Sequence, residues 1–196
     1  MVRLYRPKRI IEVGSGFSTL VATRAARSNG DTVITCIEPF PTEYFSKHLI
    51  GLESINLVVE KVQDASLETF AALGENDILF IDSSHVAKPG SDVEHLFFKV
   101  LPALRPGVLV HLHDIYLPYG YPRLNARQLR FWNENYLLAA FLHGNANWRI
   151  VLSNCLVSLD FANRQKLCAA IEPGDAAKAK RMQTQAAGGS FWMRRI

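Results

Sequence analysis

The residues with the clearest chemical potential in this sequence are acids and histidines that stand at the ends of predicted strands. Four acids recur in this way, and they are Glu12, Glu38, Asp64 and Asp82. The carboxyl ends of parallel strands meet at one edge of a sheet, where open α/β folds bind their ligands. Carboxylates accept hydrogen bonds from hydroxyl and amino groups. The four acids therefore predict a site for a ligand that carries such groups.

The segment Glu12–Thr19 contains a glycine-rich turn between a predicted strand and a predicted helix. Gly14 and Gly16 let the backbone approach a ligand, and the first N–H groups of the helix are free to bind it. A dinucleotide-binding loop needs a third glycine, and Thr19 stands there instead. Glu12 is poorly placed beside a pyrophosphate, but it suits a cationic ligand with a sulfonium and an amino group. A tight turn without a ligand is the alternative.

Two of the acids suit a nucleoside. Glu38 ends the second predicted strand, where a carboxylate can accept both hydroxyl groups of a ribose. Asp64 follows the third strand and could accept a hydrogen bond from an adenine amino group. It could equally cap a helix that starts near Ser66.

Histidines and acids also follow the fourth and fifth predicted strands. His85 and His113 are candidate general bases, because imidazole exchanges protons near neutral pH. Asp82, His113 and Asp114 could together hold a divalent cation such as Mg²⁺, which would acidify a bound hydroxyl. The alternatives are that the two aspartates only orient loops while His111 packs in the sheet, and that His85 is a surface histidine.

Alternating apolar and amphipathic segments position these residues and predict one Rossmann-like α/β domain with a doubly wound, seven-stranded, mostly parallel sheet. The predicted strands are Arg9–Val13, Thr32–Ile37, Ile55–Glu60, Asp77–Ile81, Val108–His113, Trp148–Ser153 and Ser190–Arg195. The predicted helices are Ser18–Ser28, Thr42–Leu49, Ala65–Leu73, Gly90–Leu104, Ala126–Leu142 and Phe161–Gln185. Aromatic residues in the loop Leu117–Arg123 could line an acceptor pocket, whereas Phe131 and Leu138 have the spacing of core positions.

Composition narrows the function classes. The net charge of +4 is small, and the basic residues cluster near the two ends without forming a coherent face, so we expect no nucleic-acid partner. Three widely spaced cysteines without a CxxC pair favour a reducing compartment. No apolar run is long enough to cross a bilayer, and the first residues do not form a signal peptide. We expect a cytoplasmic protein with a small-molecule substrate; a homo-oligomer is compatible with the sequence.

The chain resembles the class I S-adenosylmethionine (SAM)-dependent methyltransferases over nearly its whole length. The segments that carry this resemblance are Glu12–Gly16, Glu38, Asp64, Ile81–His85 and Leu104–Val108. The resemblance implies SAM as the cofactor. The residues expected to bind it are Glu12, Gly14, Ser15, Gly16, Ser18, Thr19, Glu38, Asp64 and Asp82.

Ile81–His85 and His111–Asp114 resemble more closely the branch related to catechol and macrolide-sugar O-methyltransferases. A basic residue at the place of His85 removes the acceptor proton in that branch, with His113 as the rival base here. Family members usually carry helices before the glycine-rich motif. Because the first strand here begins almost at Met1, we expect a single domain over residues 1–196 without those lid helices. Metal-dependent relatives end the fifth strand with two acids or Asp-Asn, whereas this chain has His113-Asp114.

The expected function is therefore methylation of a small-molecule hydroxyl. A second hypothesis is a non-catalytic SAM-binding partner domain, which the short N-terminus favours and the retained acids oppose. A third is another nucleotide-dependent Rossmann enzyme, such as an NAD oxidoreductase, which the missing third glycine opposes.

Overall fold

A seven-stranded sheet forms the centre of the protein, as the computed structural model shows for residues 1–43, 45, 47, 54–171 and 189–196. The strands are β1 (Arg9–Val13), β2 (Val33–Ile37), β3 (Ile55–Val58), β4 (Ile78–Ile81), β5 (Leu109–Leu112), β6 (Trp148–Ser153) and β7 (Phe191–Arg195). Their order is β3-β2-β1-β4-β5-β7-β6, with β7 antiparallel to both of its neighbours. The predicted doubly wound, mostly parallel sheet is confirmed.

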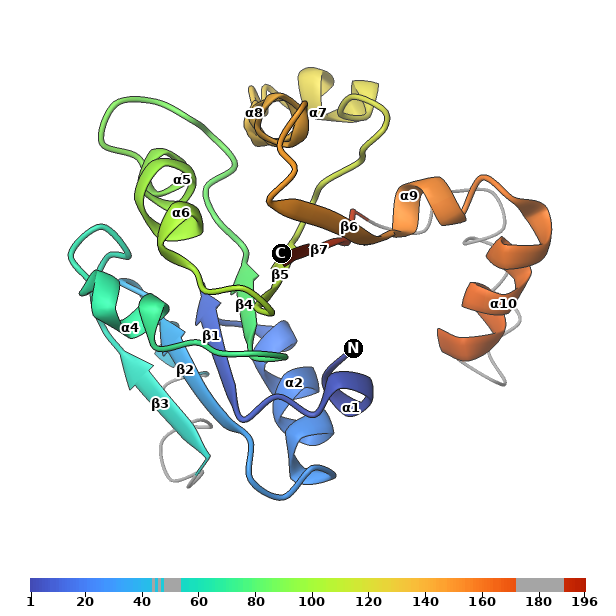
Figure 1. Ribbon diagram of the computed structural model, residues 1–196. Coiled ribbons are helices and arrows are strands. Elements are labelled where there is room, and N and C mark those ends of the chain that lie inside the picture. The colour runs from blue at the N-terminus through green and yellow to red at the C-terminus, as the bar shows by residue number, and fades with distance from the viewer. Residues whose placement is uncertain (44, 46, 48–53, 172–188) are drawn as a thin grey trace.

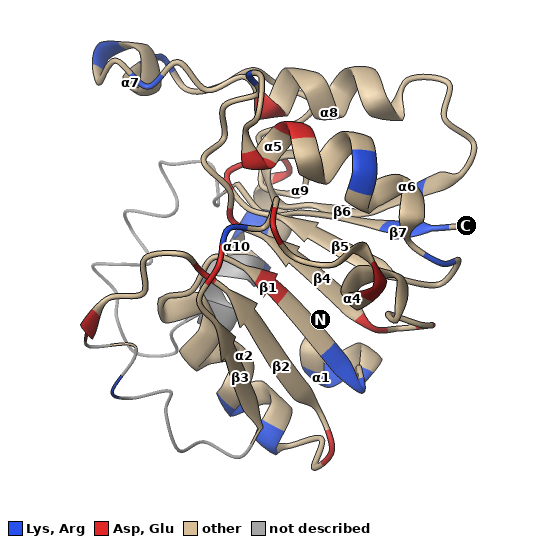
Figure 2. Cartoon of the chain, turned by 90° about the vertical axis from the view of Figure 1, so that its left-hand side faces the viewer, with Lys and Arg blue, Asp and Glu red and all other residues tan. Residues whose placement is uncertain are grey.

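Helices cover both faces of this sheet. Figure 2 shows α1 (Val2–Tyr5) and α2 (Phe17–Arg27) on one side, and α4 (Leu67–Ala71), α5 (Asp92–His95), α6 (Leu101–Ala103) and α8 (Glu134–Leu142) on the other. The remaining helical segments are the π-helical turn η1 (Leu96–Val100), α7 (Arg123–Arg127), α9 (Asn154–Val157) and α10 (Phe161–Ile171). In Figure 1, α10 lies to one side of the sheet, beyond β6 and α9.

The central strands are apolar on both faces because both faces are buried. All four residues of β4 are buried, and the two sides of the sheet pack into separate clusters. Strand order reverses between β1 and β4, since the chain runs outward to β2 and β3 before it returns. Loops that leave these two neighbouring strands therefore diverge, and a crevice opens at their carboxyl ends.

One long predicted helix is wrong. The sequence favours a single helix over Ala126–Leu142, but the chain forms α7 and α8 with an irregular segment between them, in which Leu129 has a φ of 56°. Tertiary contacts fix this break, because Asn133 binds the backbone of Ala87 through both atoms of its side-chain amide. Phe131 lies in the break and is 74% exposed, so the expectation that it belongs to the core is also wrong.

Other element boundaries differ less. Helix α4 begins later than predicted because Ser66, which accepts a hydrogen bond from the backbone N–H of Glu68, caps it, and it ends two residues earlier, at Ala71. The segment predicted as one helix up to Leu104 is formed by α5, η1 and α6 in succession. The predicted helix over residues 42–49 and the part of the last predicted helix beyond Ile171 lie largely outside the described residues.

His111 lies within β5, and its imidazole packs between two aromatic rings of neighbouring strands. Its ring stacks between those of Phe80 and Trp192, with ring-centroid distances of 4.6 and 4.3 Å, and its Nε2 lies 2.7 Å from Oγ of Ser190. Burial lowers the pKa of His111 to about 3. The alternative that this histidine packs in the sheet is confirmed.

This burial predicts a loss of stability in acid. Below its ordinary pKa of 6.5 the unfolded chain takes up a proton at His111 that the folded chain refuses down to about 3. The free energy of unfolding should therefore decrease as the pH is lowered through that window. The contribution of His111 to this decrease is at most about 1.4 kcal/mol per pH unit. His111→Phe keeps an aromatic ring and cannot titrate, so urea denaturation should show a shallower decline. An unchanged decline would exclude His111 as its source.

Candidate active site

The turn after β1 is held tightly between β2 and β4. Gly14 donates from its backbone N–H to the carbonyl of Ile37, and Asp82 donates likewise to Val13. Gly14 has a φ of +100°, and a Cβ there would lie 3.0 Å from the backbone oxygen of Asp82. A glycine is required at this position because both the conformation and the close approach exclude a side chain.

The turn closes on itself at the start of α2. The N–H of Gly16 donates to Oγ1 of Thr19, which is fully buried. Thr19 thus stabilises the loop from inside, where the dinucleotide fingerprint has glycine, and does not face a ligand. Oγ of Ser15 is buried and has no hydrogen-bond partner among the described residues. A buried polar atom without a partner is costly, and a bound polar ligand would satisfy it.

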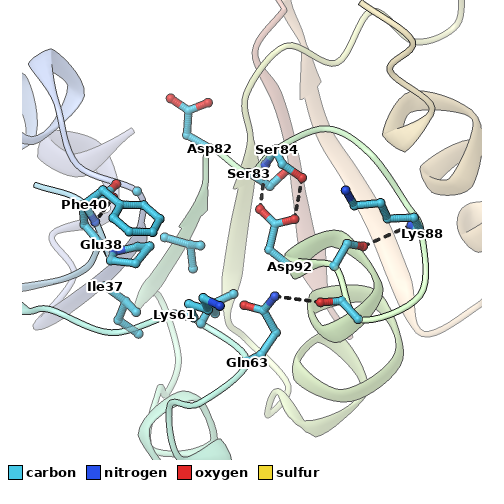
Figure 3. Close-up of a pocket in the computed structure, with 16 residues that line it drawn as sticks. Ile37, Glu38, Phe40, Lys61, Gln63, Asp82, Ser83, Ser84, Lys88 and Asp92 are labelled. Atoms are coloured by element: carbon cyan, nitrogen blue, oxygen red, sulfur yellow. Dashed lines mark hydrogen bonds between the residues drawn. The ribbon is translucent and has the colours of Figure 1, made fainter.

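A cavity of about 440 Å³ opens at the carboxyl ends of β1, β2 and β4. Figure 3 shows Glu38 and Phe40 along one side of it and Ser83, Ser84 and Asp92 along the other, with Lys61 and Gln63 between them. One oxygen of Glu38 accepts a hydrogen bond from the N–H of Phe40 at 2.8 Å. Its other oxygen has no hydrogen-bond partner among the described residues, so the carboxylate can accept hydrogen bonds from hydroxyl groups of a ligand in the cavity.

Two predicted ligand-binding acids do not line this cavity. Glu12 points to the α2 side of the sheet, is 1% exposed and accepts a hydrogen bond from Ser18 Oγ at 2.5 Å. Burial raises the pKa of Glu12, and its second oxygen lies 3.6 Å from Sγ of Cys36. Glu12 and Ser18 therefore anchor α2 to β1 instead of facing the cavity.

Asp64 is exposed and also lies outside the cavity lining, where Gln63 takes the neighbouring place. The alternative that Asp64 caps the following helix is wrong, because Ser66 is the cap. The predicted residues that line the cavity are Gly14, Glu38 and Asp82.

A second constellation brings two histidines and two aspartates together at the ends of β4 and β5. Nδ1 of His113 lies 3.4 Å from Oδ1 of Asp82 and 3.7 Å from Oδ1 of Asp114. Nε2 of His85 lies 3.6 Å from the same Asp82 oxygen and 3.9 Å from Oδ2 of Asp114. Asp82 belongs to both the cavity and this cluster, and Figure 3 shows its carboxylate directed away from Asp92.

The backbone at this cluster is held in an uncommon conformation. His85 and Asp114 have φ values of 61° and 54°. Gly189 packs directly on Asp114, since a Cβ on this glycine would lie 2.6 Å from Cα of Asp114, and its carbonyl accepts the N–H of Ile115. Left-handed backbone at non-glycine residues persists only where the surroundings impose it, and it is common at functional sites.

Asp82 and His113 shift each other's pKa in opposite directions. Burial alone would raise the pKa of Asp82, but contact with His113 and the charge of its imidazolium lower it overall. The same contact with Asp82 raises the pKa of His113. Both shifts favour an ion pair between Asp82 and His113.

The predicted metal ligands Asp82, His113 and Asp114 meet, but they do not fit a metal centre as arranged. In the described part of the chain, no group of three or more His, Cys, Asp or Glu side chains could hold a metal ion. We therefore derive no catalytic step through a metal.

One acid of this region is not among the residues predicted from the sequence. Glu134, the first residue of α8, is 1% exposed and places Oε2 2.8 Å from Nδ1 of His85. Inside the wrongly predicted long helix it looked like an ordinary polar-face glutamate. No local pattern links it to a histidine 49 positions earlier.

Comparison with known proteins shows the family of the chain. A family model described as a methyltransferase domain (Methyltransf_24) matches residues 11–115, which is more than half of the chain. The chain belongs to this methyltransferase family. The match runs from β1 to just beyond Asp114, so it contains the glycine turn, the cavity-lining acids and both histidines of the cluster. The family implies SAM as the cofactor.

Solved structures share the fold of this methyltransferase. The O-methyltransferase TomG from Streptomyces achromogenes, in complex with SAM, is 18% identical with a TM-score of 0.56, covering 100% of this chain and 75% of TomG. The plantazolicin methyltransferase BamL is 11% identical with a TM-score of 0.53, covering 99% of this chain and 80% of BamL. These identities establish similarity of fold alone.

A curated relative, an uncharacterized protein of Archaeoglobus fulgidus, is 40% identical over 76 residues. That alignment covers 38% of this methyltransferase and 34% of the relative, so the matched part is about a third of the relative's length. No helix in the described ranges is long and apolar enough to span a membrane.

Proposed function

We propose that this methyltransferase transfers the methyl group of SAM to a hydroxyl group of a small molecule, with His85 as the general base. The observation that carries the proposal is the position of Asp82, which both lines the cavity and contacts the two histidines. A nucleoside bound in the cavity would therefore end next to a group that can accept a proton.

The residues of the cavity fit the parts of SAM. The turn at Gly14 gives a ligand close access to backbone, and the next residue, Ser15, lies outside the cavity lining but has a buried Oγ without a hydrogen-bond partner among the described residues. Glu38 suits the ribose hydroxyls, and Phe40 beside it offers an apolar surface for the base. SAM supplies an electrophilic methyl group on a positively charged sulfur.

The protein's part in the reaction is to position the acceptor and to remove its proton. Methyl transfer is an in-line displacement that needs no covalent intermediate on the protein, so orientation contributes much of the rate. Nε2 of His85 faces the space beside Asp82 and Asp114, where an acceptor hydroxyl would approach the cavity. Trp132 packs on the ring of His85, and Tyr121 packs edge to face on Trp132, so aromatic side chains surround the proposed base.

Glu38→Ala tests the cofactor part of this proposal. Removal of the carboxylate should weaken SAM binding by roughly 1.5–3 kcal/mol, because hydrogen bonds from the ribose to a charged group are lost. Isothermal titration calorimetry measures the change.

Asp64→Ala is the matched control, since Asp64 is an acid of the same sheet edge that is exposed and outside the cavity. It should leave the affinity for SAM nearly unchanged. Equal losses in the two variants, or none in Glu38→Ala, would mean that SAM does not bind as proposed.

A further inference from the structure

Glu134 and His85 form a buried contact between the start of α8 and the loop after β4. The carboxylate is buried at the start of α8, and its Oε2 lies 2.8 Å from Nδ1 of His85, which is itself buried. Burial of a carboxylate is costly unless it is hydrogen-bonded and paired. An ionised carboxylate only accepts hydrogen bonds, so the His85 tautomer with its hydrogen on Nδ1 is the one that suits this contact.

The orientation of this carboxylate is fixed by Ser83. The hydroxyl of Ser83 donates to Oε1 and Oε2 of Glu134, each at 3.0 Å, and accepts a hydrogen bond from the N–H of His85 at 3.2 Å. Ser83, His85 and Glu134 thus form a closed hydrogen-bonded group, in which the Ser83 hydroxyl is shared between the two carboxylate oxygens.

The backbone binds the same two segments together. The carbonyl of His85 accepts hydrogen bonds from the N–H groups of Asn133 and Glu134, at 3.0 and 3.3 Å. The side chain of Asn133 binds both the N–H and the carbonyl of Ala87. The ring of Trp132 packs on the imidazole of His85 with a centroid distance of 4.3 Å. These contacts hold the His85 ring in one orientation, with Nε2 toward Asp82 and Asp114.

We propose that Glu134 is a positioning residue that fixes the tautomer of His85, with the hydrogen on Nδ1 and the lone pair on Nε2. The proposal rests on the function proposed above for His85. As the bond between the acceptor oxygen and the methyl carbon forms and the carbon–sulfur bond breaks, Nε2 takes the hydroxyl proton. S-adenosylhomocysteine and an imidazolium remain, and the Glu134 carboxylate stabilises that positive charge.

Glu134→Gln tests the proposal with almost no change of shape. Ser83 donates a hydrogen bond, so it should attract the amide oxygen and turn the NH₂ group toward Nδ1 of His85. The neutral ring would then carry its hydrogen on Nε2 and could no longer accept a proton there. An isosteric change of this kind in a catalytic triad costs about 10⁴-fold in kcat. We expect a fall in kcat of about 10²–10⁴-fold, with unchanged affinity for SAM.

Nitrogen-15 NMR of the imidazole gives a readout that does not depend on activity. The neutral His85 ring should show the Nδ1–H tautomer in the wild-type protein and the Nε2–H tautomer in Glu134→Gln. His85→Ala combined with Glu134→Gln should have the same kcat as His85→Ala alone, because Glu134 acts through His85.

Asp77→Asn is the control for the loss of a buried acid. Asp77 is 3% exposed and pairs with Arg9 at 3.0 Å at the far end of β4. This change should lower stability but leave kcat unaltered. An Nδ1–H tautomer that persists in Glu134→Gln, or an additive loss in the double variant, would overturn the proposal. If the wild-type protein transfers no methyl group, the proposed function fails, while the NMR comparison still decides whether Glu134 sets the tautomer.

Discussion

His85→Ala should lower kcat by about 10²–10⁴-fold while the affinity for SAM stays nearly the same. The imidazole lies beside Asp82 and Asp114, outside the cavity lining, so its loss removes a base without removing a contact to the nucleoside. Steady-state kinetics and calorimetry on the same preparation separate the two effects.

His113→Ala is the necessary comparison, because His113 contacts the same two aspartates and is the rival base. Its contact with Asp82 favours an imidazolium, which cannot accept a proton. We therefore expect a smaller loss of kcat in His113→Ala than in His85→Ala. Full activity in His85→Ala together with a large loss in His113→Ala would reverse the two roles.

Gly14→Ala should weaken SAM binding by about 10- to 100-fold, equivalent to roughly 1.4–2.7 kcal/mol. The new Cβ would lie 3.0 Å from the carbonyl oxygen of Asp82, at a φ of +100° that disfavours any side chain. The turn must shift, and it would carry Asp82 and the cavity wall with it. Thermal unfolding and calorimetry measure the two consequences, which are lower stability and weaker binding.

Gly16→Ala is a matched substitution in the same turn. Gly16 has an extended φ of 177°, and nothing lies within 4 Å of a Cβ added there. The free energy of unfolding of the Gly16→Ala variant should therefore differ from that of the wild-type protein by less than about 1 kcal/mol. If the two alanine variants have equal stability, the close approach of Gly14 to Asp82 is not what holds the turn.

The sheet could be predicted from the sequence because its pattern is local. Buried parallel strands are short apolar runs, and the run Ile78–Ile81 with its flanking turns could hardly form anything else. The break between α7 and α8 could not be predicted, because it depends on Asn133 reaching Ala87 across the fold. The sequence keeps a helical pattern of apolar residues across the break, so local patterns alone do not indicate it.

The candidate site divides in the same way. Gly14, Glu38 and Asp82 follow strands directly, so strand ends were a sufficient guide to the cavity. The glycine-rich motif contains Glu12 and Ser18 and therefore predicts them as ligand-binding residues. The alternation of side chains along β1 instead turns Glu12 to the face of the sheet that α2 covers, where it binds Ser18. Glu134 could not be predicted from the sequence, because its importance depends on its contact with His85, and only the folded chain brings the two side chains together.

The most direct test of the account is methyl transfer itself. The purified protein would be incubated with SAM carrying a deuterated methyl group and a small-molecule extract, in the presence of a metal chelator, and products would be followed by mass spectrometry. The account predicts S-adenosylhomocysteine together with a small molecule that gains one labelled methyl group as an ether, and about 100-fold less of this product or lower still from His85→Ala in the same time. Binding of SAM without any labelled product, or a label found on nitrogen or carbon instead of oxygen, would contradict it.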